Sequence, residues 1–134
     1  METEKYRKGM EVLRSMGDPE GRMAAESLKA IEELAPGLSE SVVEFCYGDV
    51  YSREGLDLKS REIASISALA VVGSRPQLMD HILTGMVLGL TKREVQEILV
   101  QITVFAGFPA ALNALETARE AFELWDANAA KGQE

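Results

Sequence analysis

Apolar residues recur at helical spacing along nearly all of this chain of 134 residues. No segment shows the period-two alternation of apolar and polar residues that is typical of a strand. Glycine and proline interrupt the helical pattern at short intervals, where they would end one helix or begin the next. The pattern therefore predicts an all-α bundle of helix hairpins joined by short loops. The expected helices cover residues 4–16, 19–35, 39–51, 58–72, 75–88, 92–106 and 109–128.

Two helix starts carry recognisable capping residues. Thr91 and Glu94 spell T-x-x-E before the 92–106 helix, so that the threonine oxygen can accept from an amide while the glutamate reaches back. Asp18 and Pro19 would begin the second helix, with the aspartate as cap and the proline in the first turn. These local signals place the helix boundaries.

The chain length favours one domain. We expect a single domain over 1–134, with a core at about 38–128 and an N-terminal helical extension at 4–35. The segment 58–72 is apolar over much of its circumference, and such a helix is usually buried on all sides. It would be buried either inside this subunit or between subunits.

The charge balance excludes some partners. With 22 acidic and 14 basic residues, the formal net charge is −8. Nucleic acids need a basic face for their phosphates, and an anionic membrane surface would repel the chain. We therefore expect no nucleic acid and no membrane as a partner. A small anionic substrate would need a local cationic pocket.

The cysteine content indicates a reducing compartment. Cys46 is the single cysteine, so the chain cannot form an internal disulfide. It lies on an apolar stripe of the 39–51 helix, which favours a buried structural thiol. The N-terminal sequence lacks the apolar core of a signal peptide, and no apolar run approaches the roughly 18 residues of a membrane span. We expect a cytoplasmic protein.

One acid and one imidazole stand out as candidate chemistry. Glu62 lies early in the 58–72 helix, and His81, the single histidine, lies in the next helix. The two helices must fold back on each other across a very short turn. Glu62 then lies about 11 residues before the turn and His81 about 6 after it, an axial mismatch of roughly 7 Å. A direct contact is possible, and so is a bridge through a water or a substrate; either would make a proton-handling site.

A structural explanation of the same residues stays open. Ser74 and Gln77 can form a capping box at the start of the 75–88 helix, and Glu62 can simply face the positive end of its own helix dipole. A lone histidine such as His81 is more often a core or boundary residue than a catalyst. The scattered carboxylates and single histidine give no metal-ligand cluster, so no metal is expected.

At these residues the chain resembles the carboxymuconolactone decarboxylase family, within the alkyl hydroperoxidase D-like superfamily. The resemblance runs from about Phe45 to Ala118 and rests on the order and spacing of several short motifs. Those motifs are GDVYSREGL at 48–56, Arg61-Glu62, the Pro76–Gly89 helix with His81, GLTKREV at 89–95, GFPAA at 107–111, and Asn113-Ala114.

The resemblance also distinguishes two branches of the superfamily. The redox branch carries two cysteines that would fall at 74 and 77, where this chain has Ser74 and Gln77. Neither can form a disulfide, so thiol peroxidase activity is not expected. The decarboxylase branch lacks these cysteines. It implies loss of carbon dioxide from 4-carboxymuconolactone to give the enol-lactone of 3-oxoadipate, in aromatic catabolism and without a cofactor.

The implied chemistry suggests a role for five residues. His81 would be the general acid or the donor to a dienolate oxygen, and Glu62 would orient it and hold its protonated form. Arg53 would clamp a substrate carboxylate, because a guanidinium matches the carboxylate fork. Tyr51 and Ser74 are further candidates for contact with the substrate.

Alternatives remain beside this hypothesis. Glu54 stands where close relatives often have proline, which leaves the pocket shape and the substrate open. The chain could act on another small acid, or assist a redox system without thiols of its own. It could also be a non-catalytic oligomeric binding protein. The resemblance further implies a homo-oligomer, commonly a hexamer built as a trimer of dimers.

Overall fold

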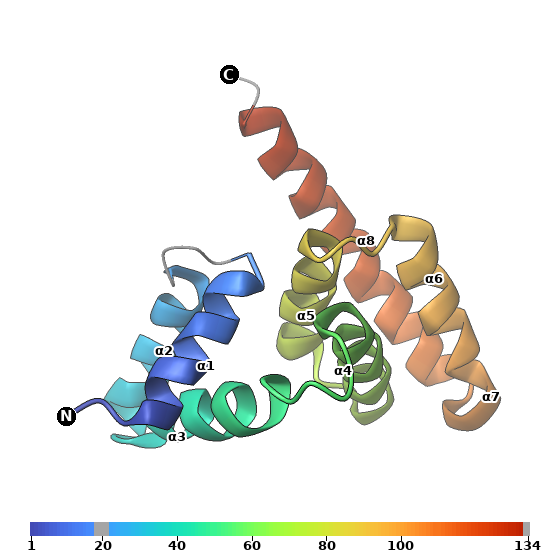
Figure 1. Cartoon of the computed structure of the whole chain (residues 1–134). Helices are drawn as coiled ribbons and strands as arrows, with labels where there is room; N and C mark the ends of the chain where they lie inside the picture. Colours follow the sequence, from blue (N-terminus) through green and yellow to red (C-terminus); the bar gives the residue numbers. More distant parts are fainter. Residues whose placement is uncertain (18–21, 133–134) are drawn as a thin grey trace. The chain divides into compact units, whose positions relative to one another are not determined.

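The computed structural model describes residues 1–17 and 22–132, with side chains from residue 28 onward in the second range. Every regular element in these residues is a helix, which confirms the expected all-α class. The expected start at Asp18 and Pro19 lies outside the described residues. The elements are α1 (Glu4–Ser15), α2 (Arg22–Leu34), α3 (Leu38–Val42), η1 (Val43–Tyr51), α4 (Leu58–Val72), α5 (Arg75–Val87), α6 (Lys92–Gln101), α7 (Thr103–Ala106) and α8 (Phe108–Lys131) (Figure 1).

The helices form two compact units, Met1–Leu58 and Lys59–Glu134. Each has its own internal packing, and each is described here by itself. The single-domain organisation expected from the sequence stays a prediction.

In the first unit, α1 packs closely against η1. The close approach depends on two glycines, Gly9 in α1 and Gly48 in η1, both buried. A Cβ added to Gly48 would lie 2.6 Å from the Lys5 carbonyl oxygen, and one added to Gly9 would overlap the Val43 carbonyl oxygen. Only a residue without a side chain fits at these two positions.

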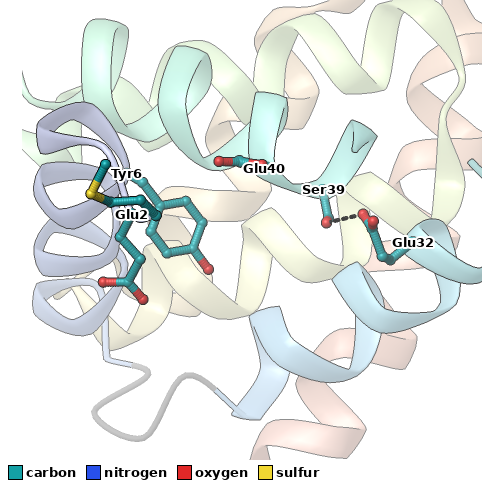
Figure 2. A pocket seen from close by; sticks show the side chains of 6 residues that line it. Glu2, Tyr6, Glu32, Ser39 and Glu40 are labelled. Carbon is teal, nitrogen blue, oxygen red and sulfur yellow. Dashed lines mark hydrogen bonds between the residues drawn. The ribbon is translucent and has the colours of Figure 1, made fainter. Parts of the chain in front are cut away.

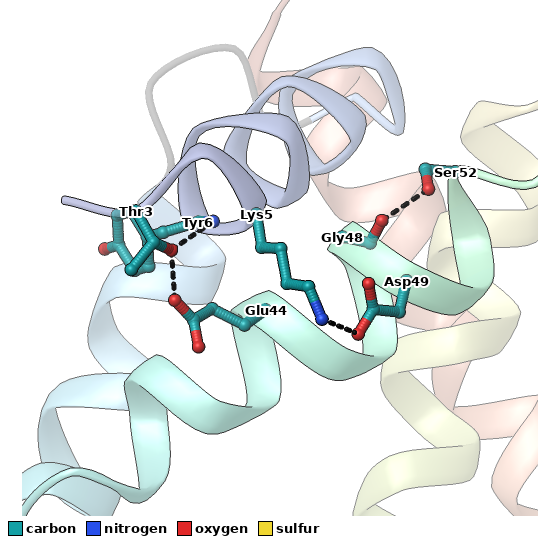
Figure 3. Close-up of polar contacts among 7 residues, drawn as sticks. All are labelled: Thr3, Lys5, Tyr6, Glu44, Gly48, Asp49 and Ser52. Atoms are coloured by element: carbon teal, nitrogen blue, oxygen red, sulfur yellow. Dashed lines mark hydrogen bonds and ion pairs between the residues drawn. The ribbon is translucent and has the colours of Figure 1, made fainter.

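Polar contacts at the start of α1 reinforce this packing (Figure 3). The Thr3 oxygen caps α1 by accepting from the Tyr6 amide at 3.0 Å, and the Thr3 hydroxyl donates to Glu44. The Lys5 ammonium forms an ion pair with Asp49 at 3.0 Å. This carboxylate raises the pKa of the Lys5 ammonium. The contacts fix the direction in which α1 runs along η1.

The expected 39–51 helix changes its winding within its length. It begins as the α-helix α3 and continues as the π-helix η1, in which the helix turn is wider. The wider turn displaces the apolar stripe that a 3.6-residue period predicts. Val43 is buried as expected, whereas Cys46 is only half-buried. The expectation of a buried thiol is therefore only partly met.

In the second unit, α8 is the longest helix and runs beside both α5 and α6 (Figure 1). Polar contacts join the same elements: Arg75 donates to Asn113 at 3.3 Å, and Lys92 pairs with Asp126 at 2.8 Å. Small residues on the buried side of α8 let the other helices approach. The core consists of Ile66, Ala70, Leu78, Ile82, Met86, Leu90, Val95, Leu99, Ile102, Ala111, Ala114, Ala118 and Ala121.

The apolar helix α4 is buried along one side only. Glu62, Ile66 and Ala70 are buried, whereas Val71 and Val72 are exposed. Burial on all sides within the chain, one of the two expectations for this segment, is thus wrong for the described residues. Within those residues, no helix combines the length and the apolarity needed to cross a bilayer.

Candidate functional site

The α4–α5 hairpin brings the predicted acid and imidazole together. Gly73 ends α4 in a left-handed conformation, with a φ of 77°. The amides of Gly73 and Ser74 both donate to the Leu69 carbonyl, at 3.0 and 3.1 Å, which closes the helix end in a Schellman-like turn. Helix α5 begins at the next residue, Arg75. This tight reversal places α5 against the side of α4 that carries Glu62.

Glu62 and His81 contact each other directly. The distance from His81 Nδ1 to Glu62 Oε2 is 2.8 Å. The Glu62 side chain is fully buried, and that of His81 is 17% exposed. An ionised carboxylate only accepts hydrogen bonds, and toward such a group Nδ1–H of His81 would be the donor. The other ring nitrogen, Nε2, faces away from the carboxylate and is free of this bond.

The second carboxylate oxygen of Glu62 is an exception among the buried polar atoms. Oε1 is buried and has no hydrogen-bond partner among the described residues. A buried acceptor without a donor is costly, by about 1–3 kcal/mol. Glu62 therefore carries one oxygen that orients the imidazole and one that a further donor would stabilise.

Asp80 is a second carboxylate beside the imidazole, and the sequence analysis missed it. Burial raises the pKa of Asp80, and the neighbouring His81 partly opposes this shift. The sequence alone could have indicated Asp80, because it directly precedes His81.

The raised pKa of Asp80 makes a prediction for stability. The folded chain holds this proton more tightly than the unfolded chain, so ionisation destabilises the fold as the pH rises above the ordinary value of 3.8. Replacing Asp80→Asn should therefore raise the free energy of unfolding at pH 7 but not near pH 3.8. The gain should stay below about 1 kcal/mol, because the side chain remains partly in water. Urea unfolding at both pH values measures it, and an equal effect at both would contradict this explanation.

Ser74 occupies the N-cap position of α5 but does not cap it. Its side chain makes no capping hydrogen bond, so the expected capping box with Gln77 is wrong. The backbone explains the difference: ψ at Ser74 is 84°, against 159° at Thr91, whose side chain does cap α6. The Schellman-like turn that ends α4 holds the Ser74 backbone in this conformation, in which the hydroxyl forms no capping bond to the amides of α5. The predicted Thr91–Glu94 capping box is confirmed.

This difference can be measured with a matched pair of variants. Thr91→Ala removes a hydroxyl that accepts from the Glu94 amide at 3.0 Å, and it should cost about 1 kcal/mol of stability. Ser74→Ala removes a hydroxyl without a capping bond and should cost much less. Thermal unfolding followed by circular dichroism compares the two. Equal losses would show that Ser74 caps α5 in solution.

Two other predicted site residues belong to the first unit. Arg53 is exposed in the turn after η1, where its amide donates to the Val50 carbonyl at 3.1 Å. The ring of Tyr51 packs against Tyr47, with centroids 5.2 Å apart. Their contact with a substrate handled by Glu62 and His81 stays a prediction.

A hollow of about 260 Å³ lies in the first unit, and none of the predicted site residues lines it (Figure 2). It is lined by Met1, Glu2, Tyr6, Glu32, Ser39 and Glu40. Glu32 has a structural role there, because it accepts from the Ser39 hydroxyl and from the Gly37 amide at the start of α3. In the residues that the structure describes, no group of three or more His, Cys, Asp or Glu side chains could hold a metal ion.

Comparison with known proteins shows which family this chain is similar to. Residues 36–120 match the carboxymuconolactone decarboxylase family, and this range includes the α4–α5 hairpin. A 4-carboxymuconolactone decarboxylase of Acinetobacter baylyi is 27% identical over 121 residues, covering 90% of this chain and 88% of that protein. An uncharacterised 15.0 kDa protein of Paracoccus denitrificans is 36% identical over 97 residues, covering 71% and 72%. An uncharacterised protein of Methanocaldococcus jannaschii is 24% identical over 96 residues, covering 72% and 89%.

Proposed function

The chain belongs to the carboxymuconolactone decarboxylase family, and on that premise we propose that it decarboxylates a 4-carboxymuconolactone-type lactone acid without a cofactor. The observation that supports this most is the 2.8 Å contact between His81 Nδ1 and the buried Glu62 carboxylate. The substrate class is proposed from the similarity to the 4-carboxymuconolactone decarboxylase of Acinetobacter baylyi.

The reaction needs a place for electrons and a source of one proton. When the bond between the ring and the substrate carboxylate breaks, carbon dioxide leaves and the electron pair stays on the ring carbon. This pair spreads through the neighbouring alkene into the lactone carbonyl, giving a dienolate. A proton delivered to carbon then completes the product. The protein must stabilise the developing oxyanion and supply that proton.

His81 is suited to supply the proton. With Nδ1–H held by Glu62 Oε2, the protonated ring presents Nε2–H on its other edge, where it can donate to the dienolate oxygen or to carbon. The negative charge of Glu62 stabilises the imidazolium until transfer. His81 is partly exposed, whereas Glu62 is fully buried. A substrate can therefore reach the imidazole but not the Glu62 carboxylate.

The remaining site residues complete the proposal. Arg53 would clamp the substrate carboxylate, supplying the cationic group that an anionic substrate needs in so acidic a chain. Ser74 has a hydroxyl that no capping bond occupies, which leaves it available to a substrate. Tyr51 would contribute an apolar wall with a polar tip.

The test is turnover of 4-carboxymuconolactone by the purified chain, followed by ultraviolet absorbance. We expect turnover by the parent chain and equal turnover by Cys46→Ser, because no thiol takes part. No turnover by a folded parent chain would overturn the proposed substrate. If the parent chain instead consumed peroxide with a dithiol, and Cys46→Ser did not, the redox alternative would replace this proposal.

A further inference from the structure

Gln77 lies one turn before His81 on the same side of α5. Residues that are four positions apart on a helix are neighbours on its surface, with Cβ atoms about 5–6 Å apart. Gln77 is exposed, and the side chain of His81 is 17% exposed. Gln77 is also the only amide side chain on α5. A molecule that reaches the imidazole of His81 along α5 therefore meets Gln77 as well.

The imidazole leans toward Gln77. In an α-helix each Cα–Cβ bond tilts toward the N-terminus, so that a long side chain covers the turn before its own Cα. For His81 this is the turn that carries Gln77. Nδ1 of His81 contacts Glu62 of α4 at 2.8 Å, which leaves the Nε2 edge of the ring for a substrate. The carboxamide of Gln77 is thus a second donor beside that edge.

The start of α5 leaves the Gln77 side chain available. A capping box would hold its oxygen at the Ser74 amide, but this amide donates to the Leu69 carbonyl at 3.1 Å. The Ser74 hydroxyl forms no capping bond either. In the first turn of a helix the partial positive charge of the N-terminus favours an anion. A negatively charged oxygen is therefore the acceptor that suits a donor at this position.

The proposed reaction needs two donors at two neighbouring atoms. The lactone oxygen of the dienolate needs a hydrogen bond while the adjacent ring carbon takes up a proton. One N–H cannot do both at once, and His81 has only its Nε2 edge to offer. The oxygen and the carbon are two bonds apart, roughly 2.4 Å. Donors placed about 3 Å from each of them can be about 5–6 Å apart, which is the spacing of side chains one helix turn apart.

We propose that Gln77 is a catalytic residue that donates an amide N–H to the lactone oxygen of the dienolate, while His81 protonates the adjacent carbon. This inference rests on the proposed function and assigns its oxyanion donor. When carbon dioxide leaves, the electron pair of the broken bond spreads onto the lactone oxygen, and Gln77 stabilises the charge without giving up its proton. The carbonyl bond then re-forms as the carbon takes the proton from Nε2 of His81, which regains one from water.

The test compares kcat and KM of the parent chain and Gln77→Met with 4-carboxymuconolactone, followed by ultraviolet absorbance. Methionine is unbranched like glutamine and has a similar helix propensity, but it has no donor. We expect kcat to fall roughly 10²-fold, the lower end for loss of an oxyanion donor. KM should stay within about twofold, because the charge on the oxygen develops only during the reaction. Gln96→Met, at an exposed position of α6, is the matched control and should behave like the parent.

Gln77→Glu is the second variant. It replaces the donor by a negative charge and should lower kcat at least as much as Gln77→Met, with Gln96→Glu as its control. Thermal unfolding followed by circular dichroism should give parent-like stability for all four variants, because both positions are exposed. If Gln77→Met did not fold, Gln77→Glu would decide the question.

The outcomes separate this inference from the proposed function. Parent-like kinetics of a folded Gln77 variant would overturn the inference and leave the proposed function standing. A raised KM with an unchanged kcat would also overturn it, because Gln77 would then bind the substrate and the transition state equally. Failure of the proposed function would appear in the folded parent chain itself, as an absence of turnover, and both would then fall.

Discussion

Replacing His81→Asn should lower kcat for the proposed lactone substrate by roughly 10²–10⁴-fold, the usual contribution of a general acid. An asparagine amide can still donate a hydrogen bond to Glu62, which keeps the buried carboxylate paired. It cannot deliver a proton as Nε2–H does. Because the pairing is preserved, the variant separates the chemistry from the fold. Steady-state kinetics and thermal unfolding, measured on the same preparation, give both quantities.

Glu62→Gln serves as the companion variant. Its amide oxygen can still accept from His81 Nδ1, but the negative charge that stabilises the imidazolium is lost. We expect a lower kcat with little change in KM, since Glu62 is buried behind the imidazole and would not hold the substrate itself. If His81→Asn and Glu62→Gln both retained full activity, the enzyme would need another acid, and Asp80 would be the first to examine.

Gly9→Ala and Gly48→Ala should each lower the stability of the first unit by about 1–3 kcal/mol, the usual cost of overpacking. Each new methyl group would meet a carbonyl oxygen: that of Val43 for Gly9, and that of Lys5 for Gly48. Backbone atoms cannot move aside as a flexible side chain would. The helix α1 must therefore shift away from η1, although alanine favours the helix itself by up to about 1 kcal/mol.

Chemical unfolding followed by circular dichroism measures these losses, with Gly55→Ala as the control. Gly55 has no atom within 4 Å of its added Cβ and no positive φ, so alanine should be tolerated there. Full stability of Gly9→Ala would mean that α1 does not approach η1 so closely in solution. In that case the Lys5–Asp49 ion pair would also be in doubt.

The helix boundaries could be predicted where the signal is local. Thr91 and Glu94 form their capping box because both side chains act on the backbone within one turn. Ser74 and Gln77 present the same pattern, yet the box does not form, because the end of α4 already determines the Ser74 backbone. A sequence pattern shows which side chains could cap a helix. It does not describe a backbone that a preceding turn has fixed.

Two other features required the three-dimensional structure. The 39–51 segment reads as one α-helix, because so short a stretch cannot distinguish an α period from the wider π period of η1. The rise along the helix axes predicted an axial offset of roughly 7 Å between the positions of Glu62 and His81. Side chains lean along and between helices, and this closes the gap to a direct hydrogen bond. The identity of the pair was predicted, and the direct contact was one of the two arrangements that the sequence left open.

The turn at Gly73 has a consequence for the order of folding. Glu62 and His81 are 19 residues apart, so their contact closes one short loop within a single hairpin. The entropy lost on closing a loop grows with its length, and local contacts generally form faster than distant ones. The pair can therefore assemble early, before α8 packs along α5. The reactive groups would then depend kinetically on their own hairpin and little on the N-terminal helices.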